Sequence, residues 1–94
     1  MKAQAEGPTA QWGERRSPQF EPELPALTTV VLPIGSIEQH GAHLPVQVDT
    51  LLASEVAQRA AGQAHPRAPM LVLPPLWVSL AEHHMPMAGT LTLD

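Results

Sequence analysis

Two carboxylates and two imidazoles lie close together in this sequence, at Glu38, His40, His43 and Asp49. If residues 38–40 are extended, Glu38 and His40 point to the same side of the backbone, because side chains alternate along a strand. A carboxylate oxygen and an imidazole nitrogen together suit Zn²⁺, Mn²⁺ or a similar divalent ion. Asp49 can return a second carboxylate, which can bridge two ions that activate a water. The sequence therefore predicts a divalent metal site at Glu38, His40 and Asp49.

Each member of this cluster also has an ordinary structural interpretation. Glu38 and His40 could be polar side chains of an exposed loop, and Asp49 could be the N-cap of a helix. His43 could contact a substrate, support a metal ligand or pack in the core. The residue types alone leave these alternatives open.

A second polar cluster, Glu82-His83-His84, occurs later in the chain. Adjacent side chains point in different directions, so at most two of the three can face a shared site. We prefer His84 as the member that faces it, and an exposed pair of histidines is the alternative.

Two short apolar runs are expected to be the strands that position these clusters. Thr28–Ile34 is rich in β-branched residues and predicts a strand buried on both faces, as in a parallel sheet. Pro33 cannot donate a ladder hydrogen bond, so the strand should end near it. Met70–Leu73 predicts a second short buried strand, which Pro74 and Pro75 stop.

The segment between these strands has a helical pattern and predicts a helix over residues 50–61. Gly62 suits the position just after the end of that helix, and Asp49 or Thr50 suits its N-cap. The expected apolar stripe consists of Leu51, Leu52, Val56 and Ala60.

This order of elements predicts an α/β fold with a βαβ unit, a right-handed crossover and parallel strands. Ligands of open α/β sheets bind beyond the carboxyl ends of the strands. The Glu38–Asp49 segment follows the first strand, and His83 and His84 follow the second. Both segments are therefore expected at the same edge of the sheet.

Composition excludes several classes of function. The formal net charge is −4, so no basic surface is expected to bind nucleic acid. The chain has no cysteine, which rules out disulfides and thiolate zinc sites. No stretch approaches the ~20 apolar residues of a membrane span, and the N-terminus lacks a secretory signal. We expect no membrane partner and a cytoplasmic protein.

The site residues belong to a longer stretch that closely resembles the opening motif of the creatininase (creatinine amidohydrolase) family. A looser resemblance to a later segment of that family covers Glu82–Pro86 and Gly89–Leu93. Met87-Ala88 stands where the family usually has an aromatic residue before the Gly-Thr pair. Together the resemblance covers about residues 28–94. The opening motif reads Leu32-Pro33-Ile34-Gly35-Ser36-Ile37-Glu38-Gln39-His40-Gly41-Ala42-His43-Leu44-Pro45, followed by Asp49-Thr50.

The resemblance implies a three-layer αβα fold and a site for two divalent ions, Zn²⁺ or Mn²⁺. It implies that Glu38 binds one ion, that His40 binds the other and that Asp49 bridges them. His43 and His84 are then the candidate catalytic histidines. The implied reaction is the hydrolysis of a C–N amide bond by metal-activated water, in a cyclic amide, a formamide or a peptide end. Family members also often form homo-oligomers.

Because the family's full domain is more than twice as long, we expect residues 27–94 to be its incomplete N-terminal βαβ part. Residues 1–26, interrupted by prolines and glycines, are expected to form an irregular arm. The family draws a further histidine and glutamate ligand from its second half, so we expect the 94 residues to be inactive alone. The alternatives are a metal-binding or interaction fragment without catalysis, and a plain α/β domain.

Overall fold

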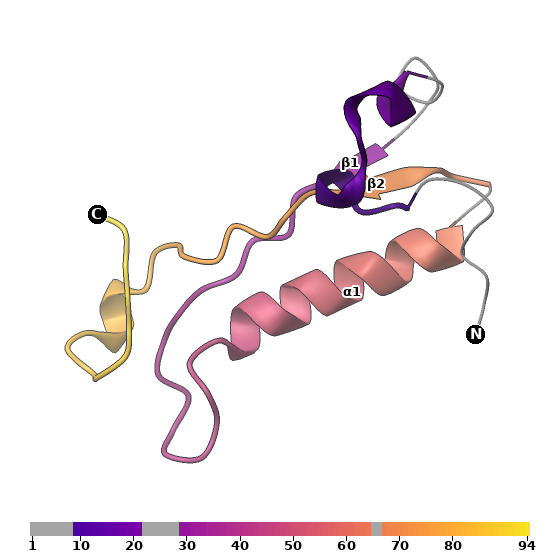
Figure 1. The fold of residues 1–94 in the computed structure, drawn as a ribbon. Coiled ribbons are helices and arrows are strands. Elements are labelled where there is room, and N and C mark those ends of the chain that lie inside the picture. The colour runs from indigo at the N-terminus through magenta and orange to yellow at the C-terminus, as the bar shows by residue number, and fades with distance from the viewer. Residues whose placement is uncertain (1–8, 22–28, 65–66) are drawn as a thin grey trace.

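The computed structural model describes residues 9–21, 29–64 and 67–94 of the chain. The predicted start of the first strand at Thr28, parts of the predicted arm and its boundary at residue 26 lie outside the described residues. The chain is extended, with principal extents of 47 × 31 × 21 Å (Figure 1). Its radius of gyration is 16.2 Å, whereas a compact chain of this length has one of about 12 Å.

A strand–helix–strand unit is the centre of the structure. β1 (Thr29–Val31) is followed by α1 (Val48–Ala64) and then by β2 (Met70–Val72). The two strands pair in parallel, with Val30 opposite Leu71, and α1 packs against β2 (Figure 1). The predicted parallel βαβ unit is therefore confirmed.

The strands are short because proline interrupts both of them. Pro33 has no N–H to donate, and the regular ladder of β1 ends two residues before it. Pairing nevertheless continues beyond the strands, because Leu76 N–H donates to Pro33 O at 2.9 Å and Gly35 N–H donates to Leu76 O at 2.8 Å. This continued pairing carries the two chain segments side by side toward the predicted site.

α1 is longer than its sequence pattern indicated. It begins at Val48 and ends at Ala64, so the predicted limits of 50 and 61 are wrong by a few residues at each end. Asp49 lies inside the first helical turn rather than at the N-cap, where its carboxylate still complements the helix dipole. Gly62 lies within the helix and does not terminate it.

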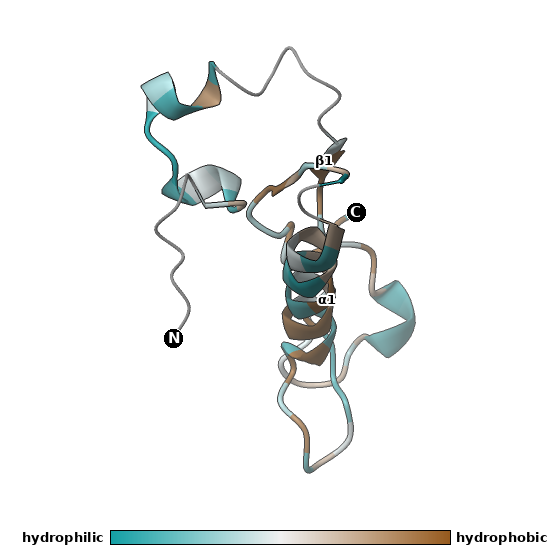
Figure 2. Cartoon of the chain, turned by 90° about the vertical axis from the view of Figure 1, so that its right-hand side faces the viewer, coloured by the Kyte–Doolittle hydropathy of each residue, from teal (hydrophilic) through white to brown (hydrophobic). Residues whose placement is uncertain are grey.

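The burial of apolar side chains on α1 differs most from what the sequence predicted. The predicted helix stripe is exposed, with Leu52 57% and Val56 64% accessible, and α1 instead contacts β2 through Ala57 and Ala61. Small side chains suit this close packing, which the helical period alone could not show. Figure 2 shows hydrophobic residues (brown) and hydrophilic residues (teal) along the length of α1.

The sequence predicted that the first strand is buried on both faces, and this prediction is wrong for β1. Val30 is 45% exposed and Ile34, just beyond the strand, is 57% exposed. The reason is that α1 packs on β2 and leaves β1 largely uncovered. β2 is the central element, and its Leu71 and Val72 are buried as predicted.

Part of the N-terminal arm packs on the free edge of β2. Val72 N–H donates to Ala10 O at 2.8 Å, and Gln11 forms a parallel bridge with Val72. Two short 3-10 helices follow, Trp12–Glu14 and Ser17–Phe20. Within the described ranges, no helix combines the length and hydropathy needed to cross a bilayer.

Candidate metal centre

The loop after β1 is held against the start of α1 by the hydroxyl group of Thr50. Ser36 N–H donates to Thr50 Oγ1 at 3.1 Å, and the hydroxyl proton is within reach of two carbonyl oxygens, Ser36 O at 3.0 Å and Trp77 O at 3.1 Å. Gly35 permits this approach, because a Cβ there would overlap the backbone and hydroxyl of Thr50. This junction fixes Glu38 and Asp49 relative to each other.

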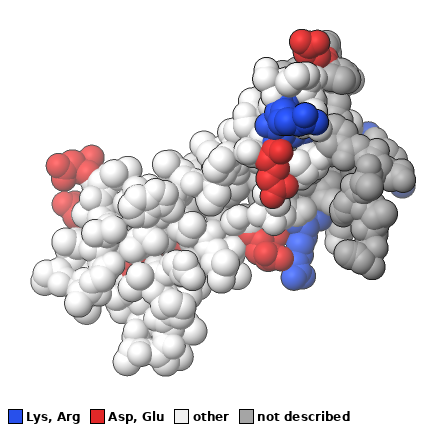
Figure 3. Space-filling model, in the orientation of Figure 1, with Lys and Arg blue, Asp and Glu red and all other residues white. Residues whose placement is uncertain are grey.

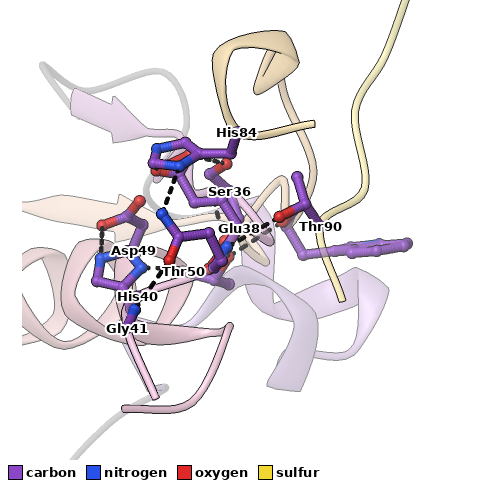
Figure 4. Close-up of polar contacts among 10 residues, drawn as sticks. Ser36, Glu38, His40, Gly41, Asp49, Thr50, His84 and Thr90 are labelled. Carbon is purple, nitrogen blue, oxygen red and sulfur yellow. Dashed lines mark hydrogen bonds and ion pairs between the residues drawn. The ribbon is translucent and has the colours of Figure 1, made fainter. Parts of the chain in front are cut away.

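The segment after β2 is tied to the same loop from the other side. Gln39 N–H donates to the buried Thr90 Oγ1 at 2.9 Å, and Leu91 N–H donates to Ile37 O at 2.9 Å. The short 3-10 helix Glu82–His84 lies in this segment. The expectation that both polar clusters reach one edge of the sheet is therefore confirmed (Figure 4).

Two overlapping groups of side chains in the described residues could hold a metal ion. One consists of Glu38, His40 and Asp49, and the other of Glu38, His83 and His84. Within each group, one ligand atom from each residue lies within 4.8 Å of the others. The three residues predicted as ligands are therefore brought together, as Figure 4 shows for their side chains.

Glu38 is the residue common to both groups and is mostly buried, with 13% of its side chain exposed. Ser36 Oγ–H donates to Glu38 Oε2 at 2.8 Å, and His84 Nε2 lies 3.1 Å from Glu38 Oε1. The Ser36 hydrogen bond is the main cause of a lowered pKa at Glu38, and His84 and His83 lower it further. Glu38 is therefore anionic at neutral pH, as a cation ligand must be.

His40 and Asp49 face each other beside Glu38. His40 Nε2 lies 3.5 Å from Asp49 Oδ1, and His40 Nδ1 lies 3.2 Å from the carbonyl oxygen of Glu38. The side chains are 24% and 39% exposed, respectively, so solvent reaches this side of the cluster. An imidazole nitrogen and a carboxylate oxygen are thus available on the open side of the site.

The two predicted catalytic histidines occupy different positions. His84 contacts Glu38, whereas His43 is exposed and makes no hydrogen bond or ion pair with another residue of the described ranges. His43 lies on the turn after Gly41, a glycine with a φ of 78°. The structure therefore brings His84 into the cluster and leaves His43 beside it.

Sequence reasoning missed three residues that organise the cluster: Ser36, Gln39 and Thr50. All three lie in the quoted motif, but their types gave no chemical signal because hydroxyl and amide groups are common in loops. Gln39 Nε2 lies 2.9 Å from His84 Nδ1 and links segments 45 residues apart. Thr50 was considered only as a helix cap.

Charge is distributed unevenly around the cluster. Residues 29–58 and 68–94 contain no lysine or arginine. The basic side chains visible in Figure 3 lie in the right-hand half of the view, beside acidic ones, and the left-hand end shows only acidic and uncharged residues. The segments that form the cluster thus contribute carboxylates and no lysine or arginine, a charge balance that favours cations over anions.

Comparison with known proteins places this arrangement in a family. The creatininase family model, described as creatinine amidohydrolase, matches residues 13–94. Mycofactocin precursor peptide peptidase from Mycobacterium ulcerans (strain Agy99) is 34% identical over 70 residues, covering 69% of this chain and 28% of the relative. The same peptidase from Mycobacterium tuberculosis (strain CDC 1551 / Oshkosh) is 32% identical over 78 residues, covering 76% of this chain and 31% of the relative.

Solved structures show the same fold. A manganese creatininase superposes with a TM-score of 0.82 at 28% identity, covering 93% of this chain and 35% of that structure. A glutamate-to-glutamine mutant creatininase of the Zn-Zn type superposes with a TM-score of 0.81 at 30% identity, covering 94% and 35%. The chain thus spans about a third of the length of these relatives and has part of their αβα fold. It belongs to the creatininase family.

Proposed function

We propose that Glu38, His40 and Asp49 bind divalent metal, Zn²⁺ or Mn²⁺, and that this site serves the hydrolysis of a C–N amide bond. The observation that carries the proposal is the approach of three candidate ligand atoms to within 4.8 Å of one another, on segments without lysine or arginine. Two carboxylates and one imidazole are a hard and borderline donor set that suits these ions. The Mn and Zn-Zn forms among the similar creatininases support the choice of metal.

Each side chain has a distinct part in this proposal. Glu38 would hold one ion, His40 would hold a second and Asp49 would be shared between them. Ions held there would activate a water and polarise the substrate carbonyl. The chain's own contribution is to hold Glu38 ionised through Ser36 and to keep Asp49 next to His40 through the first turn of α1.

The substrate is proposed to be a small cyclic amide, a formamide or a peptide end. The support is that relatives of this chain include a creatinine amidohydrolase family and a precursor peptide peptidase. His43 is exposed beside the cluster, so we assign it to the substrate side of the site. His84 is enclosed by Glu38 and Gln39, so its role is a different one.

A second candidate function is metal binding by these 94 residues without catalysis. Two observations favour it: the extended shape, and the solvent access to Asp49, whose side chain is 39% exposed. Amide hydrolysis depends on excluding bulk water from the reacting groups. On this view, turnover needs further protein surface around the ligands.

Both functions are tested with the 94-residue chain and two variants. Zn²⁺ and Mn²⁺ are titrated by calorimetry into wild type, Glu38→Gln and the matched control Glu55→Gln, whose carboxylate lies on α1 and pairs with Arg59. Hydrolysis of creatinine, a formylated amine and a short peptide is followed with and without a chelator. We expect Glu38→Gln, and not Glu55→Gln, to lose metal binding.

The outcomes separate the candidates. Turnover that a chelator and Glu38→Gln both abolish supports the hydrolase. Metal binding that depends on Glu38 without turnover supports the non-catalytic function. Wild type that takes up neither ion contradicts both.

A further inference from the structure

Two histidines each direct Nε2 toward a carboxylate in the cluster, but their Nδ1 atoms have opposite kinds of partner. His40 Nδ1 lies 3.2 Å from the carbonyl oxygen of Glu38, which can only accept a hydrogen bond. His84 Nδ1 lies 2.9 Å from the side-chain amide nitrogen of Gln39, which can only donate one. When both rings are neutral, these partners place their protons on different nitrogens.

The orientation of the Gln39 amide group is fixed by the backbone. Gly41 N–H donates to Gln39 Oε1 at 2.9 Å, and a backbone N–H has no acceptor capacity. The oxygen must therefore face Gly41, which leaves Nε2 to face His84. The backbone of Gln39 is itself anchored, since its N–H donates to Thr90 Oγ1 at 2.9 Å.

A neutral imidazole carries one proton, so the state of one nitrogen determines that of the other. His84 accepts at Nδ1, and its proton is on Nε2, 3.1 Å from Glu38 Oε1. His40 donates from Nδ1, so its Nε2 keeps a lone pair, 3.5 Å from Asp49 Oδ1. Two electron-pair donors facing each other are the arrangement that a cation stabilises.

We propose that Gln39 holds His84 in the Nε2–H form, so that His84 donates a hydrogen bond to Glu38 and positions this carboxylate instead of binding metal. Glu38 then receives one donor on each oxygen, Ser36 on Oε2 and His84 on Oε1. Each carboxylate oxygen has a further lone pair with which to bind an ion. Gln39 and His84 are thus positioning residues for the metal centre, and this role rests on the proposed function.

The competing assignment is a metal ion held by Glu38, His83 and His84. Such an ion would need the lone pair of His84 Nε2, which would move the proton to Nδ1. The Nδ1–H group would then face the Gln39 amide nitrogen at 2.9 Å, so that two donors would oppose each other. Gln39 therefore disfavours this second group as a metal site.

The first experiment measures the histidine tautomers directly. Two-bond ¹H–¹⁵N correlation spectra are recorded on the metal-free, ¹⁵N-labelled 94-residue chain above about pH 8, where ordinary histidines are neutral. We expect an unprotonated Nδ1 for His84 and an unprotonated Nε2 for His40. A protonated Nδ1 on neutral His84 would overturn the proposal, whether or not the chain binds metal.

Gln39→Glu tests the cause of this tautomer. It replaces the donating amide nitrogen with an accepting oxygen of the same geometry, so the Nδ1 signal of His84 should change to the protonated type. The matched control is Gln58→Glu, because Gln58 lies on α1, where its amide nitrogen donates to Ser54 Oγ at 3.2 Å. Equal spectra for wild type and Gln39→Glu would refute the role of Gln39.

Zn²⁺ calorimetry separates positioning from ligation. His84→Gln keeps an N–H group that can reach Glu38, whereas His84→Ala removes it. We expect His84→Ala to weaken Zn²⁺ binding by about 10- to 100-fold, the range for residues that only orient a ligand. His84→Gln should restore most of this loss, and equal losses in both variants would identify His84 as a ligand. A wild type with the expected tautomers and no Zn²⁺ affinity would reject the proposed function but keep the tautomer assignment.

Discussion

Two regions of the molecule are held together in different ways. One is the body, which consists of β1, α1 and β2, and the other is the polar edge, the network around Ser36, Glu38 and Thr50 beyond the ends of the strands. In the body, α1 and β2 meet through a few small buried side chains, including Ala57 and Ala61, and large apolar side chains such as Val56 remain exposed. At the edge, few apolar groups are buried, but Ser36, Thr50 and their neighbours are joined by side-chain and backbone hydrogen bonds. The contrast teaches that a polar network can fix the relative positions of side chains where the hydrophobic core is small.

The largest expected effect concerns metal binding at the polar edge. Asp49→Asn removes the proposed bridging charge, so we expect Zn²⁺ affinity to fall by more than the ~100-fold limit for residues that only orient ligands. In the metal-free chain the free energy of unfolding should fall by no more than about 1 kcal/mol, because the change removes only a helix-dipole interaction and a partly solvated contact with His40. Calorimetry and urea unfolding measure the two quantities, with Glu55→Gln as control. Unchanged affinity would contradict the assignment of Asp49.

The same substitution at two glycines should have opposite effects. Gly35→Ala places a methyl group where it overlaps the backbone and side chain of Thr50, so the junction must shift, and this should destabilise the chain by about 1–3 kcal/mol. Gly62→Ala has no atom within 4 Å of its new Cβ and lies in a helix, so it should stabilise by about 0.5–1 kcal/mol. Denaturant unfolding measures both. A Gly35→Ala variant as stable as wild type would show that the Gly35–Thr50 junction is not close-packed.

Two valines in the body, one buried and one exposed, should respond differently to truncation. Val72 is 2% exposed and Val56 is 64% exposed. Val72→Ala should cost about 1–3 kcal/mol through lost burial and a cavity, and Val56→Ala should stay within about 0.5 kcal/mol of wild type. Thermal or urea unfolding distinguishes them. If Val56→Ala cost as much as Val72→Ala, the exposed helix face would have to be covered in solution.

The smallest expected effect is that of the exposed ion pair on α1. Arg59 Nε lies 2.9 Å from Glu55 Oε2, with the two side chains 75% and 51% exposed. Arg59→Gln should change the free energy of unfolding by only about 0.3–0.5 kcal/mol. The difference should vanish near 1 M salt, where the Debye length is about 3 Å. A larger loss, or one that salt leaves intact, would show that the body depends on charge as the polar edge does.

The connectivity and the approach of the two polar segments were predictable from the sequence, because both depend on local patterns. The β-branched run before Pro33 and the run before Pro74 marked two strands, and the helix between them required a parallel crossover. Parallel strands bring their carboxyl ends together, so Glu38 and His84 could be expected at one edge. These inferences use only chain direction and alternation.

Burial and the bonding of the cluster were not predictable in the same way. The helical period identified an apolar stripe containing Leu52, but which face meets β2 depends on how closely the two elements approach, and Ala57 and Ala61 allow the closest approach. The role of Gln39 depends on the direction of one amide group, which Gly41 sets through the folded backbone. A linear pattern contains neither kind of information.

The separate origins of Glu38 and Asp49 have a mechanical consequence. One follows a strand and the other lies in the first turn of α1, so an ion shared between them would cross-link the sheet to the helix. An ion that binds only the folded chain stabilises it by about 2.7 kcal/mol at a free concentration of 100 times its dissociation constant. Because the apolar interior of this molecule is so small, such a metal cross-link would supply a large share of its free energy of unfolding.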